Sequence, residues 1–398
     1  MATKVTFPNS RMASIRMAGG IREILTRAEQ MEREGRSIIH MELGRPDFDS
    51  PKCAKDRVVR ELAAGNVHYT DMAGSYELRA AVAAKYRREN NMPFVDADKN
   101  VVITNGAMEA LTASFLTLFE PGDEVIVQTP YFSAYADELA IANAILVPTK
   151  TTMEDGFCLR RDALEAAYTP KSKAILLNSP NNPSGAVLSR ESLEEIAAFA
   201  REHDLWVISD ECYEKFVYGA EHVSIASLPG MAERTVTVSA ASKTWSMTGW
   251  RIGWVVAPEA MRPYVNKCHQ NLTTCANSFA QAGVVTALEE AAPDVAAMVA
   301  EYKRRRDMVV ARLAEIPGFE SITPEGAFYA FPRIASLGMD GFTFCNKLLE
   351  EAGVSAVPSE VFGMPGHIRI AYCREYEYIE EGLRRIKAAV EGMLKNKK

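Results

Sequence analysis

The chain has 398 residues, of which 47% are hydrophobic, so it can bury one large core or two moderate ones, and a small disulfide-stapled fold is excluded. The 45 basic and 52 acidic residues leave a net charge of −7, which provides no electrostatic basis for binding a nucleic-acid backbone. No stretch approaches the roughly 18 apolar residues that span a bilayer, so we expect neither a nucleic acid nor a membrane as a partner.

The seven cysteines are scattered along the chain, without the close spacing of a zinc site, so we expect no bound metal. Their odd number fits reduced thiols in a reducing compartment. The N-terminal segment lacks the continuous apolar run of a secretion signal. We therefore expect an unexported, cytoplasmic protein.

From about residue 100 the sequence alternates short β-branched runs with longer amphipathic segments, a pattern typical of a mostly parallel sheet covered by helices on both faces. Seven of these runs are rich in Val, Ile or Leu and too short for helices. They span residues 101–104, 124–128, 144–148, 174–178, 205–210, 235–239 and 252–257. The sequence therefore predicts an α/β fold built on a seven-stranded sheet.

Amphipathic helices are expected between these strands. The segment 189–203 carries apolar residues at helical spacing, and Ser189 is placed to cap its first turn. Another helix should start near Ala107. Beyond residue 280 the character changes to a long charged helix at 291–313, short strands near 326–332 and 367–372, and a final amphipathic helix. This change predicts a second, smaller α+β domain.

The basic run at 303–306 lies on the long charged helix, beside Glu301 and Asp307. We interpret it as a solvated helix face and not as a binding patch. No repeat, low-complexity tract or Gly/Ser linker separates the two regions, so we expect a continuous helix or short loop to join them.

The first candidate for chemistry is Lys243, which follows the strand at 235–239 and would emerge at the sheet rim. Desolvation there favours the neutral amine, which can condense with the aldehyde of pyridoxal phosphate as a Schiff base. The alternative is an ordinary solvated lysine.

The second candidate is Asp210, at the end of an apolar strand, where a buried carboxylate requires a cation or several donors. A protonated pyridine nitrogen would serve, and the alternative is a cap for the segment that follows. Tyr213 lies three residues later, so its hydroxyl can reach the ring oxygen from the same side, although alone it would be an ordinary core residue.

Two further segments also lie at strand ends. The loop at 178–185 contains two prolines and three asparagines, and it presents Asn182, whose amide can donate to the same ring oxygen. Asn105, Gly106 and Ala107 stand between a strand and a helix, where free backbone N–H groups and the helix dipole favour a phosphate. Arg251 can add a bidentate contact to that phosphate. Each segment alone would be an ordinary turn or surface residue.

Together these segments resemble the class I/II aminotransferases of the fold-type-I pyridoxal-phosphate enzymes, an aspartate-aminotransferase-like family, over nearly the whole chain. The family's loop asparagine and proline match Asn182 and Pro183, its aspartate matches Asp210, and its Schiff-base lysine matches Lys243. We expect a large cofactor-binding domain at 46–285 and a small domain formed by both termini, 1–45 and 286–398.

The resemblance implies roles for four more residues. Phe132 would stack on the pyridine ring, and Arg369 would bind the substrate's α-carboxylate in a pocket that Gly44 lines. Tyr69 is similar to the tyrosine that reaches the partner subunit's phosphate, so a homodimer with shared active sites is expected.

The sequence departs from the family pattern at two positions. Ala240 stands where many relatives have a phosphate-binding serine, and Ser184 replaces a threonine. The resemblance also implies cis peptide bonds before Pro130 and Pro183.

The implied function is transfer of the amino group of an L-amino acid, aspartate-like by default, to a 2-oxo acid such as 2-oxoglutarate by a ping-pong mechanism. Lys243 would serve as anchor and proton shuttle. Alternatives are carbon–sulfur β-elimination, racemisation or decarboxylation on the same cofactor, or a non-catalytic sensor of pyridoxal phosphate. Arg11, Arg16 and Arg22 could bind an acidic substrate side chain or be surface charges.

Overall fold

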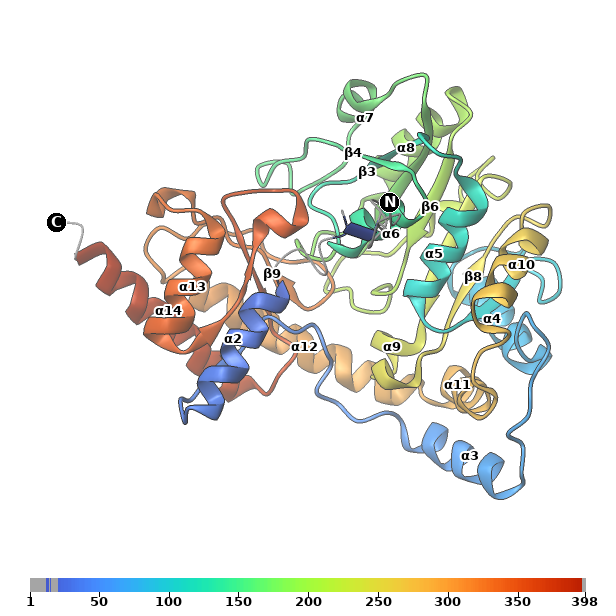
Figure 1. The fold of residues 1–398 in the computed structure, drawn as a ribbon, viewed down its shortest axis with the longest axis horizontal. Coiled ribbons are helices and arrows are strands. Elements are labelled where there is room, and N and C mark those ends of the chain that lie inside the picture. Colours follow the sequence, from blue (N-terminus) through green and yellow to red (C-terminus); the bar gives the residue numbers. More distant parts are fainter. Residues whose placement is uncertain (1–11, 14, 16–20, 396–398) are drawn as a thin grey trace, which may run out of the picture.

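The structure is a computed structural model that describes residues 12, 13, 15 and 21–395 (Figure 1). Its centre is a seven-stranded sheet of order β2-β8-β7-β6-β5-β3-β4. The strands are β2 Val101–Thr104, β3 Glu124–Val127, β4 Ile145–Pro148, β5 Ser172–Asn178, β6 Trp206–Asp210, β7 Thr235–Ala240 and β8 Gly253–Val256. Only β8 runs against the direction of the other six strands, so the predicted mostly parallel sheet is confirmed.

The central strands of the sheet are built from apolar runs. Val207 and Ile208 on β6, and Val236 and Val238 on β7, are fully buried, as expected for central strands that are covered on both faces. The β4 strand lies at an edge and is partly exposed. Its Pro148 is tolerated because proline, which has no N–H to donate, is confined to such edges.

Helices cover both faces of the large sheet. Around it lie α3 Lys52–Ala63, α4 Tyr76–Glu89, α5 Ala107–Leu118, α6 Ala134–Ile141, α7 Arg161–Ala167, α8 Arg190–Glu202, α9 Ala241–Thr244, α10 Arg262–Thr273 and α11 Ser278–Glu290. Alternate strand residues face opposite layers: Val207 packs with α7 and α8, and Ile208 packs with α5, α6 and α10. The predicted cap of α8 is present, since Ser189 Oγ accepts the N–H of Ser192 at 3.1 Å.

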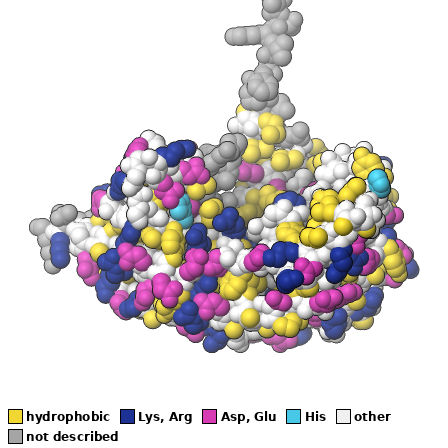
Figure 2. All heavy atoms as spheres, turned by 90° about the horizontal axis from the view of Figure 1, so that it is seen from below, with side chains coloured by type: hydrophobic (Ala, Val, Ile, Leu, Met, Phe, Trp, Pro, Cys, Tyr) yellow, Lys and Arg dark blue, Asp and Glu magenta, His cyan; other side chains and the backbone are white. Residues whose placement is uncertain are grey.

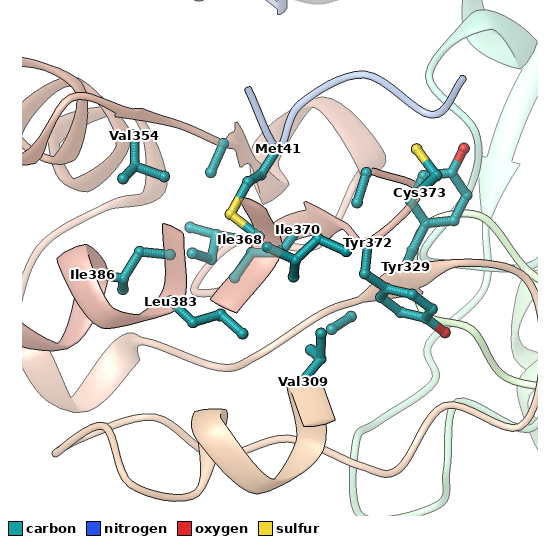
Figure 3. Packing of buried hydrophobic residues seen from close by; sticks show 14 of the residues in the cluster. Met41, Val309, Tyr329, Val354, Ile368, Ile370, Tyr372, Cys373, Leu383 and Ile386 are labelled. Atoms are coloured by element: carbon teal, nitrogen blue, oxygen red, sulfur yellow. The ribbon is translucent and has the colours of Figure 1, made fainter. Parts of the chain in front are cut away.

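A smaller α+β assembly combines α2 Ile21–Arg33, near the start of the chain, with the C-terminal part of the chain. It comprises α2, β1 Ile39–His40, α12 Ala292–Leu313, β9 Tyr329–Ala330, α13 Gly341–Ala352, β10 Val354–Ser355, β11 Val357–Pro358, β12 Ile368–Ala371 and α14 Tyr376–Lys395. The short 3-10 helices among the described residues are η2 Ile225–Ser227, η3 Thr248–Trp250, η4 Ala335–Leu337 and η5 Ser359–Phe362. The β1 strand pairs with β10, and β12 lies between β11 and β9. Met41 packs here against Ile368, Ile370 and Leu383 (Figure 3).

The basic run at 303–306 is not the solvated face that the sequence suggested. Lys303 and Arg304 are exposed, but the side chains of Arg305 and Arg306 are 6% and 8% exposed. Arg305 donates to both carboxylate oxygens of Asp47, at 2.9 and 3.0 Å, and so ties α12 to the N-terminal segment. The solvated-face interpretation fails because successive helix residues point about 100° apart, so four in a row cannot share one face.

Acidic and basic side chains are interspersed over the face shown in Figure 2. Many of them form ion pairs along or between helices, such as Arg312 with Glu380. None of the helices among the described residues is long and apolar enough to cross a membrane.

Candidate active site

Lys243 lies on the short helix α9, three residues beyond the end of β7. Its Nζ donates to the backbone oxygen of Gly44 at 2.6 Å and lies 5.9 Å from the ring centre of Tyr213. Burial lowers the pKa of this amine below its ordinary value, and the positive charges of Arg369 and Arg251 act in the same direction. A lysine with a lowered pKa is available as a neutral nucleophile.

Asp210 is a buried carboxylate at the end of β6, the strand next to β7. Its Oδ2 accepts the hydroxyl of Tyr135 at 2.7 Å, and its Oδ1 accepts the N–H of Cys212 at 3.1 Å. Burial raises the pKa of this carboxyl, and those hydrogen bonds only partly oppose the effect. The capping alternative does not hold, because a turn and not a helix follows. A nearby cation would stabilise the ionised group.

Arg369, on β12, is a buried cation that makes no ion pair with a described residue. Its Nη1 donates to Asn182 Oδ1 at 3.0 Å, its Nη2 donates to the backbone oxygen of Glu42, and its Nε has no partner. The guanidinium carbon lies 4.7 Å from the ring centre of Tyr329. A planar fork with an unsatisfied donor suits a carboxylate ligand. Because Asn182 Oδ1 accepts from Arg369, the side-chain NH₂ group of Asn182 is left to donate to another acceptor.

The turn before α5 is shaped for close contact with Arg251. Gly106 has a φ of +85°, and a Cβ there would lie 2.4 Å from Arg251 Nη2. Arg251 itself is left-handed, with φ +57°, and its Nη1 donates to the backbone oxygen of Thr248 at 2.9 Å. Glycine is therefore required at 106 for the guanidinium to pack against the turn.

The prediction that the backbone N–H groups at 105–107 are free is wrong for two of the three. The N–H of Asn105 donates to Glu109 Oε2 at 2.5 Å, and that of Gly106 donates to the backbone oxygen of Thr104 at 2.9 Å. Ala107 is the first residue of α5, and its N–H has no intrahelical acceptor. A phosphate here would be held by the helix start and Arg251.

Phe132 and Tyr69 lie in different surroundings. Phe132 is half-buried, and its ring packs edge-on, with centres 5.6 Å apart, against Tyr135, whose hydroxyl donates to Asp210. Tyr69 is 84% exposed and lines an open pocket of about 420 Å³ with Val67 and Phe279. Within this chain no described contact joins Tyr69 to Lys243 or Asp210.

Two tyrosines of the site were not predicted. Tyr135 holds Asp210, and Tyr329 shares a hydrogen bond of 2.8 Å with the hydroxyl of Tyr213. A Cβ at Gly44 would lie 1.9 Å from Tyr329 Oη, so glycine is needed there. Burial raises the pKa of Tyr329 to about 12, although the charge of Arg369 opposes this. No local signal in the sequence marks these two tyrosines, because Tyr135 lies on α6 and Tyr329 on β9, where aromatic residues are also typical of a core.

The remaining expectations concern the loops and the N-terminal arm. The peptide bonds before Pro130 and Pro183 are cis, as predicted, and that before Pro180 is cis as well. Ser184 Oγ donates to Asn181 Oδ1 at 2.7 Å and so fixes the loop internally. Ala240 is buried at the end of β7. The positions of Arg11 and Arg16, and the side chain of Arg22, lie outside the described residues.

Comparisons with known proteins agree with this geometry. Residues 36–386 match the family described as aminotransferase class I and II. The arginine–pyruvate transaminase AruH of Pseudomonas aeruginosa is 40% identical over 370 residues, which cover 92% of this chain and 93% of that protein. An aspartate aminotransferase of Pyrococcus abyssi is 41% identical over 368 residues, which cover 91% of this chain and 93% of that protein.

A solved structure of the aspartate aminotransferase from Thermus thermophilus with maleate superposes on the chain with a TM-score of 0.92. The two are 34% identical, and the match covers 97% of this chain and 100% of the other. All three relatives are named as aminotransferases or transaminases, which favours transamination over the elimination and sensing alternatives. The chain therefore belongs to the class I and II aminotransferases, which depend on pyridoxal phosphate, and it is an aminotransferase itself.

Proposed function

We propose that this aminotransferase holds pyridoxal phosphate between Lys243 and Asp210 and transfers the amino group of an L-amino acid to a 2-oxo acid. The observation that carries the proposal is the convergence of a half-buried amine and a buried carboxylate at the ends of the adjacent strands β7 and β6. Burial shifts the two pKa values in opposite directions, down for the amine and up for the carboxyl, which suits a nucleophile and a group awaiting a cation.

The residues present fit the cofactor. Asp210 would pair with the ring nitrogen, because it is a buried carboxylate without a cationic partner among the described residues. Asn182 and Tyr213 have donors for the ring oxygen, and Phe132 would cover the ring face. The phosphate would bind Arg251 and the backbone amides of Ala107 and Met108. Gly106, which has no side chain, keeps this turn open.

The cofactor, when bound, supplies a sink for the electrons of a broken Cα–H bond. Arg369 binds the substrate's α-carboxylate with its planar fork, and Gly44 lines that pocket. Lys243 Nζ, oriented by the carbonyl of Gly44, takes the proton from the substrate's Cα. The same amine returns a proton in the second half-reaction, so one residue serves as anchor and shuttle.

We also propose that the active enzyme is a homodimer to which Tyr69 of each subunit contributes. Support comes from apolar side chains exposed on α3, on the loop after it and on α10, at the end of the molecule away from α14 (Figure 1). They are Val59, Leu62, Val67, Tyr69, Tyr264 and Leu272. Exposed apolar side chains at one end of a molecule are typical of a subunit interface.

The domain division and the location are further parts of the proposal. We assign residues 46–285 to a large cofactor-binding domain and residues 1–45 and 286–398 to a small one. The pairing of β1 with β10 and the shared core of α2 with α13 and α14 support this division. All seven cysteines are free thiols, which supports a cytoplasmic location.

For the substrate we propose an aspartate-like L-amino acid as donor and 2-oxoglutarate as acceptor. Relatives named for aspartate, aromatic amino acids and arginine define the alternatives. The test is a panel of amino donors with 2-oxoglutarate, with Lys243→Ala as the inactive control. Glutamate formation from aspartate that exceeds formation from alanine, phenylalanine and arginine supports the proposal. Preference for one of those others would overturn the substrate assignment and leave transamination intact.

A further inference from the structure

The turn at residues 210–214 has two faces. Asp210 and Tyr213 are three residues apart and face the site, where they contact Tyr135 and Tyr329. Glu211 and Glu214 are also three residues apart, and their carboxylates contact a different set of side chains. The backbone of this turn is also bonded to the neighbouring strands: Glu211 N–H donates to Val238 O at 2.9 Å, and Asp210 O accepts Ser179 N–H at 3.3 Å and Asn178 Nδ2 at 3.1 Å.

Glu214 is paired with a buried lysine from α4. The side chains of Lys85 and Glu214 are 2% and 5% exposed, and Lys85 Nζ donates to Glu214 Oε1. Asn90, at the end of α4, accepts from Lys85 at 2.8 Å and donates to Glu214 Oε2 at 2.8 Å. Burial alone raises the pKa of Glu214, but the charge of Lys85, with those of His222 and Lys215, lowers it to about 2. The carboxylate is therefore kept ionised inside the protein.

Glu211 is held by three further side chains. Its Oε1 accepts from Ser209 at 2.9 Å, and its Oε2 accepts from Ser224 at 2.7 Å and lies 3.3 Å from His222 Nε2. Asn90 Nδ2 also donates to Ser224 Oγ at 2.8 Å. The two glutamates thus belong to one connected buried network, which links the turn to α4, to β6 and to the loop at 222–224.

The network does not require a metal ion. Ligand atoms of Glu211, Glu214 and His222 lie within 4.8 Å of one another, a spacing that could suit a cation. However, each carboxylate oxygen of the pair already accepts from a lysine, serine or asparagine, and Lys85 supplies a positive charge in direct contact. The cation of this cluster is the ammonium group of Lys85.

We propose that Lys85, Glu211, Glu214 and His222 form a positioning network that fixes Asp210 and Tyr213 against the cofactor. The inference rests on the proposed roles of those two residues. The anchored carboxylates of Glu211 and Glu214 restrict rotation of the turn. The side chains of Asp210 and Tyr213 therefore keep a fixed direction into the site. Supporting groups of this kind set the geometry of functional side chains that they orient.

The test compares Lys85→Met with Arg79→Met in the purified holoenzyme. Arg79 is the matched control, because it is also a buried cation on α4, bonded to Gly74, Ala97 and Asp98 away from the turn. The readouts are the melting temperature, the dissociation constant of pyridoxal phosphate, and the midpoint pH at which the absorption of the bound cofactor changes. Both variants should lose thermal stability, since each loses a buried ion pair or its hydrogen bonds.

Only Lys85→Met should weaken cofactor binding, and the loss should be about tenfold or more, as it is for residues that orient the ligands of a metal ion. Only this variant should also shift the midpoint pH of the absorption change. Lys85→Arg should restore most of the binding. Equal cofactor affinity and equal midpoint pH in the two methionine variants would overturn the inference. A wild-type protein that fails to bind the cofactor would instead overturn the proposed function. If Lys85→Met does not fold, Lys85→Met/Glu214→Gln removes the unpaired charge, and the same comparison decides the question.

Discussion

Removing the hydroxyl of Tyr135 tests whether its hydrogen bond to Asp210 contributes to the reaction. Tyr135 is 1% exposed, and Asp210 Oδ2 accepts its hydroxyl at 2.7 Å. Tyr135→Phe removes that donor and leaves the rest of the ring, so the carboxylate keeps only its bond from Cys212. A hydrogen bond to a charged group contributes about 1.5 to 3 kcal/mol. Each 1.4 kcal/mol is about a factor of ten, so kcat/KM for the amino donor should fall about 10- to 100-fold.

The assay is the rate of the donor half-reaction, followed by the absorption of the bound cofactor across pH. The pKa of Asp210, already raised by burial, should rise further in the variant, so the loss should be greatest at low pH. Tyr218→Phe is the control, because it removes a buried hydroxyl that donates to the backbone oxygen of Ala327. If Tyr135→Phe keeps the wild-type kcat/KM and pH profile, Asp210 does not act through this bond.

Three further predictions follow from the site and its network. Arg369→Lys keeps the charge but loses the planar fork, so steady-state kinetics should show the donor's KM raised about tenfold, and an unchanged KM would argue against carboxylate binding there. Gly106→Ala places a Cβ 2.4 Å from Arg251 Nη2 at a φ of +85°, so cofactor titration should show weaker binding, and wild-type affinity would contradict the close packing. The pKa of Glu214 falls from 4.5 to about 2, so its stabilising effect is complete above pH 4.5 and is lost as pH falls toward 2. Glu214→Gln should flatten the dependence of unfolding free energy on pH in that window, and parallel curves would refute the pairing with Lys85.

Much of the fold could be predicted because its signals are local. The buried runs at 101–104 and 206–210 are continuous and apolar, and both are strands in the structure. The antiparallel direction of β8 could not be predicted, because strand direction depends on connections and not on composition. The burial of Arg305 could not be predicted either, because its partner Asp47 lies 258 residues earlier in the chain.

The same distinction applies to the site. Lys243, Asp210 and Asn182 could be predicted as candidates because each lies at the end of a buried strand or within four residues of it, and strand ends gather at one edge of a parallel sheet. Tyr135 and Tyr329 were missed because their partners lie 75 and 116 residues away. A buried tyrosine whose hydroxyl meets a carboxylate has the same local sequence as one that only fills the core.

The most direct test of the central proposal is to reduce the purified holoenzyme with borohydride and to identify the labelled lysine by peptide mass spectrometry. The proposed site predicts that the reduced cofactor is attached to Lys243 and that Lys243→Ala carries no label. Attachment to any other lysine, or label that persists in Lys243→Ala, would contradict it.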